Sequence, residues 1–273
     1  MSKYKLICVD LDGTLLDSNQ RLSSVNKKAI IKALDAGIEV AIVSGRPNCF
    51  TMRIMNQIDK RVGHITFNGA YYRVAGKTKR FPINFDVVKE IARLAREYNI
   101  RIYFKNKNLG LCTKSDPGIM DYDKYRDITE PKDLLDFHYY VDAPTYFDEN
   151  KMDVLKIYCW DDNLEQLHKL GDEVSKLPHI NFFRYPYYFE CCSNETNKGL
   201  AIEKVSEELG IKKEEIVCIG DNFNDVAMFK VAGLSIAMEN APKAVKEQCD
   251  IVTLTNNEDG VAYAIDNYIL NQK

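Results

Sequence analysis

Residues 6–14, LICVDLDGT, decide the fold of this chain, because an apolar run ends there in two aspartates and a glycine. Such a run, bounded by a glycine turn, is typical of a buried strand. Side chains alternate along a strand, so Asp10 and Asp12 are expected to project near one another at its end. Two neighbouring carboxylates are costly unless a cation or a shared proton relieves their repulsion. An ordinary Asp-Gly turn would explain Asp12 but not Asp10, so the sequence favours chemistry here.

Strand and helix patterns alternate on both sides of this stretch and return near the C-terminus. Helical spacing with a cap or stop residue marks the helices, and short β-branched runs mark the strands. The expected elements are helices at 23–37, 47–60, 199–209 and 259–270 and strands at 39–43, 64–67, 216–219, 234–237 and 251–254. This alternation predicts right-handed βαβ units and a parallel sheet.

Residues 82–192 differ in composition from the rest of the chain. They hold 11 of the 16 tyrosines, seven of the 12 phenylalanines and Trp160. Their expected elements are helices at 87–98 and 164–177 and strands at 100–104 and 154–160. We therefore expect residues 82–192 to form a second α/β domain inserted into a core made of residues 1–81 and 193–273. One continuous domain of 273 residues is the alternative.

Composition excludes several classes of partner and site. The net charge is −3 and no basic block occurs, which argues against a nucleic-acid partner. The N-terminal apolar run is too short for a signal or membrane segment, so no membrane partner is expected. The eight cysteines lack zinc-type spacing, and Cys191 and Cys192 are adjacent. These cysteines are expected to be reduced and mostly buried in a cytoplasmic protein. The four histidines form no metal-ligand spacing either.

Polar residues gather where the core strands are expected to end. Ser44 follows the second strand, and Asp221, Asn224 and Asp225 follow the strand near the C-terminus. Lys198 lies just before a helix. Taken singly, these residues fit an ordinary turn, a helix cap and a solvated lysine. Ligands bind open parallel sheets at the carboxyl ends of the strands, so together they predict one site.

These residue types suit phosphoryl transfer. Asp10 can attack phosphorus to form an aspartyl-phosphate, and Asp12 can protonate the leaving oxygen and then activate water. Mg²⁺ prefers oxygen ligands, so Asp10, Asp221 and a backbone carbonyl could hold it. Lys198 supplies a positive charge to the phosphate, and Ser44 with nearby backbone N–H groups positions the other oxygens.

Four segments together resemble the motifs of the haloacid dehalogenase superfamily of phosphatases, and within it the Cof-type sugar-phosphate phosphatases. They are DLDGTL at 10–15, SGR at 44–46, Lys198, and GDNFND at 220–225 followed by Met228. The resemblance covers the whole chain, because residues 82–192 fall where these proteins carry an α/β cap. It implies a Rossmann-like parallel-sheet core and an inserted cap domain.

The resemblance also implies roles for single residues. Asp10 would be the nucleophile and Asp12 the acid and base, with Lys198 as the third catalytic residue. Mg²⁺ would be held by Asp10, the backbone carbonyl of Asp12 and Asp221, and Asp225 would support that site. The residues expected to contact the phosphate are Leu11, Ser44, Gly45, Lys198 and Asn224.

The sequence thus predicts a Mg²⁺-dependent phosphomonoesterase of small phosphorylated metabolites, with sugar phosphates expected. A phosphomutase with the same aspartyl-phosphate and a non-enzymatic metabolite-binding protein are the alternatives. Asp12 favours hydrolysis, because a base so close to the nucleophile can activate water. The candidates for substrate specificity in the inserted segment are Tyr185, Tyr187, Tyr188 and Glu190, although aromatic residues most often fill cores. The sequence identifies neither the substrate nor the oligomeric state.

Overall fold

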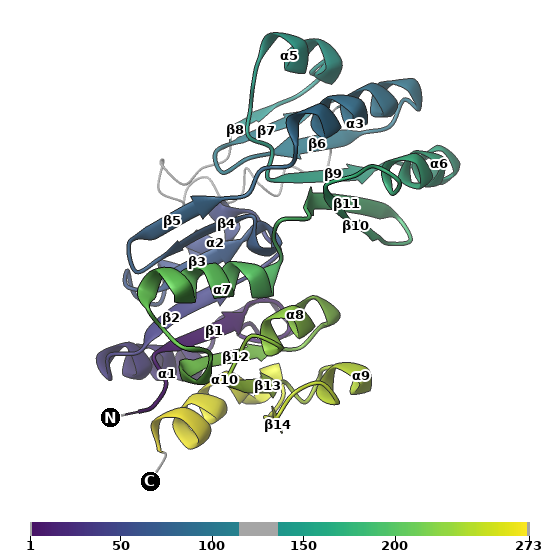
Figure 1. Ribbon diagram of the computed structural model, residues 1–273. Coiled ribbons are helices and arrows are strands. Elements are labelled where there is room, and N and C mark those ends of the chain that lie inside the picture. The colour runs from purple at the N-terminus through teal and green to yellow at the C-terminus, as the bar shows by residue number, and fades with distance from the viewer. Residues whose placement is uncertain (1, 115–135, 272–273) are drawn as a thin grey trace. The chain divides into compact units, whose positions relative to one another are not determined.

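The computed structural model describes residues 2–114 and 136–271 and divides the chain into two compact units (Figure 1). The first, called the core unit below, comprises Met1–Lys79 and Thr196–Lys273. The second, called the inserted unit, comprises Arg80–Glu195. Each unit combines helices with one sheet, so the predicted α/β class is confirmed.

The core unit is built on an eight-stranded sheet in the order β14-β13-β12-β1-β2-β3-β4-β5 (Figure 1). The strands from β14 to β3 run parallel, and β4 pairs antiparallel with β3. The bounds are β1 Leu6–Asp10, β2 Glu39–Val43, β3 Gly63–Thr66, β4 Tyr71–Val74, β5 Lys77–Arg80, β12 Ile216–Gly220, β13 Leu234–Ala237 and β14 Ile251–Val252. The central strand β1 is buried along its whole length, which explains its uninterrupted apolar run.

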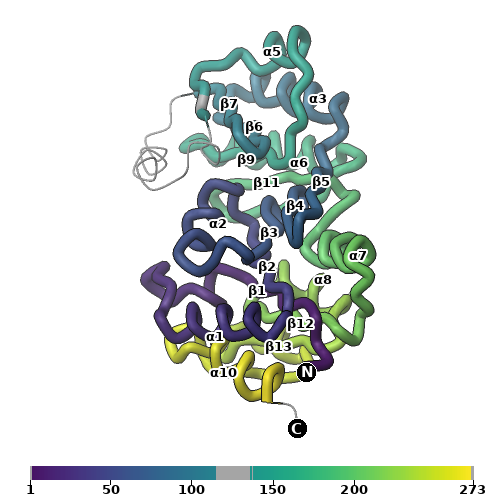
Figure 2. The backbone as a smooth tube through the Cα atoms, turned by 90° about the vertical axis from the view of Figure 1, so that its left-hand side faces the viewer, coloured from purple at the N-terminus to yellow at the C-terminus, as the bar shows by residue number. Residues whose placement is uncertain are grey.

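Helices cover the core sheet. They are α1 Ser24–Asp35, α2 Asn48–Met55, α7 Lys198–Leu209, α8 Val226–Phe229, α9 Lys243–Lys246 and α10 Gly260–Ala264. Helices α1 and α10 lie side by side (Figure 2), and their apolar residues form one cluster with Ile7 and Val9 of β1. Ser23 caps α1 by accepting a hydrogen bond from the Asn26 N–H at 3.0 Å, as its sequence predicts.

Several expected boundaries in the core unit are wrong. Helix α2 ends at Met55, because the chain tightens into turns in which Gln57 N–H bonds to the Ile54 carbonyl. The last helix agrees with its expected bounds: it begins at Gly260 and continues as a π-helix over Ile265–Leu270. Strand β14 spans two residues only, and Phe67 lies outside β3. The strands β4 and β5 are absent from the sequence prediction.

The inserted unit contains a six-stranded sheet in the order β10-β11-β9-β6-β7-β8 (Figure 1). Its strands are β6 Ile102–Lys105, β7 Leu109–Cys112, β8 Asp136–His138, β9 Lys156–Trp160, β10 Ile180–Arg184 and β11 Tyr188–Ser193. Its helices are α3 Phe85–Glu97, α5 Ala143–Glu149 and α6 Leu164–Val174. The sequence predicts β6, β9, α3 and α6 but misses the remaining elements.

The two faces of this second sheet differ in chemistry. Ile102, Phe104 and Ile157 pack with α3, α5 and α6 in one apolar cluster. Tyr103 and Tyr158 are paired across β6 and β9, so both project from the opposite face. Their ring centroids are 5.8 Å apart. Alternation along β6 and β9 therefore gives this unit an apolar core on one side and an aromatic face on the other.

All eight cysteines are free thiols, and seven of them are buried, as the sequence analysis expects. Among the described residues, no helix combines the length and apolar character needed to cross a bilayer.

Candidate active site

The predicted site residues of the core unit gather at the carboxyl ends of three neighbouring strands. Asp10 is the last residue of β1, Ser44 follows β2 and Asp221 follows β12. Strand β1 lies between β12 and β2 and pairs parallel with both. These three loops therefore emerge at the same edge of the sheet, where open parallel sheets bind their ligands.

Lys198 lies between two carboxylates at this edge. Its Nζ donates to Oδ1 of Asp10 at 2.5 Å and to Oδ1 of Asp225 at 2.5 Å. The lysine is 1% exposed, although it is the first residue of α7. Burial alone would lower the pKa of Lys198. The charges of Asp10 and Asp225 have a larger effect in the opposite direction, so the pKa is well above its ordinary value. The ammonium therefore stays charged at the centre of the site.

Helix α7 can bring Lys198 this deep because it closely approaches α8. A Cβ atom on Gly199 would lie 2.2 Å from the carbonyl oxygen of Ala227. The side chain of Asn197 caps the helix by accepting the N–H of Leu200 at 2.9 Å. The short sequence Asn197-Lys198-Gly199 thus supplies a cap, a cation and a close contact between helices.

Asp225 supports the loop that carries Asp221. Its Oδ2 accepts the backbone N–H groups of Asp221 and Asn222, both at 2.9 Å, while its Oδ1 binds Lys198. Gly220 leaves room for this side chain, because a Cβ there would lie 2.7 Å from the Asp225 carboxyl. Both oxygens of Asp225 are therefore engaged within the protein.

The surroundings of Asp10 and Asp221 disfavour the ionised forms of these two carboxyl groups. Burial raises the pKa of Asp10 well above its usual value, and the charge of Asp225 adds to this while Lys198 opposes it. Burial likewise raises the pKa of Asp221 to about 6, although a hydrogen bond from Thr14 Oγ1 at 2.7 Å acts in the opposite direction. Additional positive charge near Asp10 and Asp221 would stabilise their ionised forms.

The donor set fits a divalent cation. Oxygen atoms of Asp10, Asp221 and Asp225 lie within 4.8 Å of one another. Because both oxygens of Asp225 are engaged elsewhere, Asp10 and Asp221 are the carboxylates suited to hold Mg²⁺. Gly13 leaves the space beside them open, since a Cβ on this residue would lie 2.5 Å from Asp221 Oδ2. A larger residue at this position would displace the carboxylate.

The chain bends at Gly45 and Arg46, and Ser44, Gly45 and Arg46 are called the Ser44 loop below. The Ser44 N–H donates to the Ile65 carbonyl at 2.8 Å, and the Ser44 carbonyl accepts the Asn68 N–H at 3.1 Å. Gly45 lies against the Asn68 side chain, because a Cβ there would be 2.8 Å from Asn68 Oδ1. The loop is thus held by the segment that follows β3.

Asp12 lies on the turn after β1, and its carboxylate binds Arg46, a contact that the sequence does not predict. Arg46 Nε donates to Asp12 Oδ2 at 2.7 Å, and Arg46 Nη2 pairs with Asp12 Oδ1. Arg46 is the last residue of the SGR motif at 44–46, and this motif indicates that a polar residue acts here. Nothing in the sequence indicates that its partner is Asp12.

The side chains of the other two residues predicted to contact phosphate, Asn224 and Leu11, are not directed into the hydrogen-bond network described above. Asn224 is exposed on the loop after β12 and is not hydrogen-bonded through its side chain to any described residue. The side chain of Leu11 is buried in the core cluster, so only its backbone is available to a ligand. Two buried polar side chains were not predicted: the amide of Asn48 and the hydroxyl of Thr66 lack hydrogen-bond partners among the described residues.

The specificity candidates of the inserted unit share one neighbourhood. The Tyr185 and Tyr188 rings stack with centroids 4.3 Å apart, and Tyr188 in turn contacts Tyr158 at 5.2 Å. Glu190 pairs with Lys156 at 2.5 Å. Tyr187 is 70% exposed.

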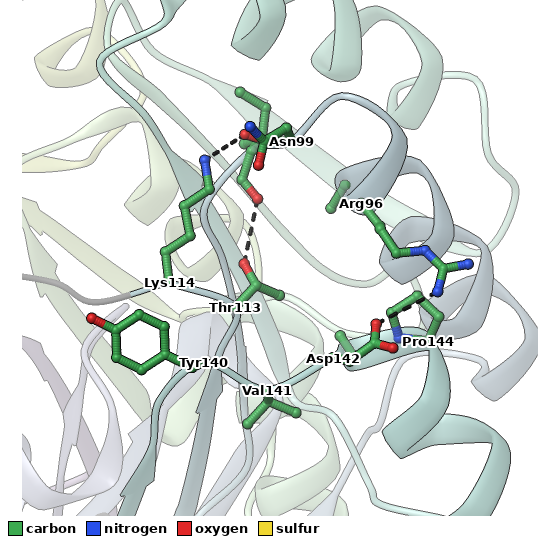
Figure 3. A pocket seen from close by; sticks show the side chains of 11 residues that line it. Arg96, Asn99, Thr113, Lys114, Tyr140, Val141, Asp142 and Pro144 are labelled. Atoms are coloured by element: carbon green, nitrogen blue, oxygen red, sulfur yellow. Dashed lines mark hydrogen bonds and ion pairs between the residues drawn. The ribbon is translucent and has the colours of Figure 1, made fainter.

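A separate pocket of about 270 Å³ lies in the same unit (Figure 3). Its polar groups bind one another: Arg96 pairs with Asp142 at 3.6 Å, and Lys114 Nζ donates to the Asn99 carbonyl at 2.5 Å. This pocket contains none of the predicted site residues.

Comparison with known proteins identifies the family of this chain. Residues 7–265 match the family model of haloacid dehalogenase-like hydrolases. A 5-amino-6-(5-phospho-D-ribitylamino)uracil phosphatase of Bacillus subtilis is 30% identical, covering 97% of this chain and 96% of the relative. A haloacid dehalogenase-like hydrolase from Bacteroides thetaiotaomicron superposes with a TM-score of 0.83 at 29% identity, over 96% of this chain and 98% of the other. A sugar phosphatase of subclass IIB gives a TM-score of 0.73 at 25% identity, covering 97% and 98%. The chain therefore belongs to the haloacid dehalogenase-like hydrolases.

Proposed function

We propose that this protein is a Mg²⁺-dependent phosphomonoesterase that hydrolyses small phosphorylated metabolites through an aspartyl-phosphate. The observation that carries the proposal is the buried contact of Lys198 Nζ with Asp10 Oδ1 at 2.5 Å, beside the carboxylate of Asp221. A nucleophilic carboxylate next to a fixed cation is suited to attack a phosphate dianion.

In the first step, an Asp10 carboxylate oxygen forms a bond to phosphorus while the bond from phosphorus to the leaving oxygen breaks. Asp12 enters this step in its protonated form and gives that proton to the leaving oxygen. In the second step, Asp12 accepts a proton from water, and the water oxygen displaces Asp10 from phosphorus. Free phosphate and the carboxylate of Asp10 are restored, so a single site performs both half-reactions.

The other residues hold the phosphate. Lys198 contributes an ammonium that stays charged, and Ser44 with the backbone of Gly45 and Leu11 would bind the non-reacting oxygens together with Asn224. Mg²⁺, held by Asp10, Asp221 and the Asp12 backbone carbonyl, would supply further positive charge to the phosphate. Asp225 would act indirectly, because it fixes both Lys198 and the Asp221 loop.

We propose sugar phosphates as the first substrate class to test. One similar structure is a sugar phosphatase, and a similar curated protein is a phosphatase of a phosphoribityl compound. We further propose that the inserted unit is the cap expected at residues 82–192, with Tyr185, Tyr187, Tyr188 and Glu190 contacting the substrate. Buried free thiols support a cytoplasmic location.

The test is release of inorganic phosphate from a panel of sugar phosphates and other phosphorylated metabolites, with and without Mg²⁺. We expect turnover that EDTA abolishes and Mg²⁺ restores, and no turnover after Asp10→Asn. Full activity of Asp10→Asn would contradict the mechanism. Transfer of the phosphate to a second sugar without net release would identify a phosphomutase instead.

A further inference from the structure

Arg46 binds both oxygens of the Asp12 carboxylate. Its Nε donates to Oδ2 at 2.7 Å and its Nη2 pairs with Oδ1. The planar fork of a guanidinium fits a carboxylate in this two-bond arrangement and fixes its direction as well as its place. The orientation of Asp12 therefore depends on where Arg46 is held.

Arg46 is itself held by its backbone and its side chain. Its N–H donates to Ser44 Oγ at 3.1 Å, and its carbonyl accepts the N–H of Phe67 at 3.1 Å. Its Nη2 also binds Gln20 Oε1. The guanidinium thus links the Ser44 loop to the turn that carries Asp12.

The segment that holds the Ser44 loop has an unfavourable backbone. Phe67 and Asn68 both have left-handed conformations, with φ of 54° and 55°. A left-handed backbone is unfavourable for most residues other than glycine, and such conformations cluster at functional sites. Asn68 uses this conformation to donate its N–H to the Ser44 carbonyl at 3.1 Å. An unfavourable backbone conformation therefore accompanies the hydrogen bond that fixes the loop carrying Arg46.

The ion pair itself adds little to stability. The side chains of Arg46 and Asp12 are 29% and 43% exposed, and ion pairs with this much contact to solvent contribute little to the free energy of unfolding. A role in orientation explains the arrangement better than a role in stability.

We propose that Arg46 is a positioning residue that aims the Asp12 carboxylate for its proton transfers. This inference rests on the proposed function, in which Asp12 serves the leaving oxygen and the attacking water. In this role Arg46 acts through Asp12 and contributes nothing of its own to phosphate binding.

The test is a double-mutant cycle with Arg46→Met, Asp12→Ala and the combined variant. We expect Arg46→Met to lower kcat/KM on a sugar phosphate roughly tenfold to hundredfold, which is part of the roughly 10²- to 10⁴-fold that a positioned acid or base contributes. The loss should be smaller on 4-nitrophenyl phosphate, whose leaving group needs no proton. In the Asp12→Ala background, Arg46→Met should cost nothing further. The inhibition constant of inorganic phosphate should stay at its wild-type value.

Arg61→Met is the matched control, because Arg61 also binds both oxygens of one carboxylate, that of Asp59, at 3.0 and 2.8 Å. It should keep wild-type kcat/KM. If Arg46→Met does not fold, Arg46→Lys replaces it in the cycle, since lysine keeps the charge but lacks the fork.

Two results would overturn the role of Arg46 and leave the proposed function intact. One is a further loss of kcat/KM when Arg46→Met is added to Asp12→Ala. The other is a rise in the inhibition constant of phosphate in Arg46→Met that equals its loss of kcat/KM. Either would make Arg46 a direct phosphate ligand. A wild-type protein without turnover on any substrate would overturn the proposed function, and this inference with it.

Discussion

Lys198 Nζ lies 2.5 Å from Asp10 Oδ1, although the two residues are 188 positions apart in the sequence. The same nitrogen lies 2.5 Å from Asp225 Oδ1, so one ammonium serves two buried carboxylates. Lys198 is therefore part of the charge balance of the folded core unit as well as of the proposed chemistry.

The first prediction concerns the loss of this ammonium. Lys198→Met leaves Asp10 and Asp225 buried without their counter-charge, which is expected to cost about 3–5 kcal/mol. Urea unfolding in EDTA at neutral pH measures this free energy. Phosphatase activity should be lost in the same variant.

Lys204→Met is the control on the same helix, because the Lys204 side chain is 45% exposed and its one ion pair with a described residue is that with Glu207 at 3.0 Å. Its free energy of unfolding should change by less than about 0.5 kcal/mol. Equal urea midpoints for the two variants would show that Lys198 does not balance the buried carboxylates.

The second prediction is a pH dependence caused by Asp221. Its pKa is raised from 3.8 to about 6, mainly by burial, so the folded metal-free protein holds this proton more tightly than the unfolded chain. Its contribution to stability is fully present below about pH 4 and is lost as the pH rises through 6. In EDTA, Asp221→Asn should therefore gain stability relative to wild type between pH 4 and pH 7.5.

Other carboxylates titrate in the same range, so the quantity to measure is the difference in free energy of unfolding between the two proteins. Mg²⁺ should stabilise wild type more than Asp221→Asn at pH 7.5, because it binds the ionised carboxylate. A difference that is constant with pH would contradict the prediction.

The third prediction uses two glycines with similar backbones. Gly13 and Gly37 have φ of 77° and 83°, so alanine at either position bears a similar strain of about 1–2 kcal/mol. Only at Gly13 would the new Cβ meet another group, Asp221 Oδ2 at 2.5 Å, whereas Gly37 has open space. Gly13→Ala should abolish activity, and Gly37→Ala should keep it. Comparable loss in both variants would mean that strain, and not displacement of Asp221, is responsible.

The sequence identifies the strand ends of the core unit well, because their signals are local. The apolar run before Asp10 and the one before Asp221 each indicate a buried strand that ends in a carboxylate. That β1 and β12 are neighbours depends on pairing between residues about 210 positions apart, which no local pattern encodes. The expected meeting of Asp10 with Lys198 therefore needed all four motifs and the family resemblance.

Local sequence patterns do not predict conformations that depend on contacts between distant residues. Phe67 extends an apolar run and is expected to continue β3, but its N–H bonds to Arg46 and its φ is 54°. The pairing of Arg46 with Asp12 joins two loops by side chains only. Hydrophobic periodicity describes elements and not such contacts, so it predicts neither.

The last prediction concerns a buried hydroxyl at the end of β3. Thr66 is fully buried, and its Oγ1 has no hydrogen-bond partner among the described residues. Thr66→Val removes this unsatisfied group without changing the shape, so the free energy of unfolding should rise by about 1 kcal/mol. Thr253→Val is the matched control: its buried Oγ1 donates to the Gly260 carbonyl at 2.8 Å, so this variant should lose about 1–3 kcal/mol. Urea unfolding of both variants should give shifts of opposite sign, and a loss of stability in Thr66→Val would mean that its hydroxyl binds an ordered water or a ligand group.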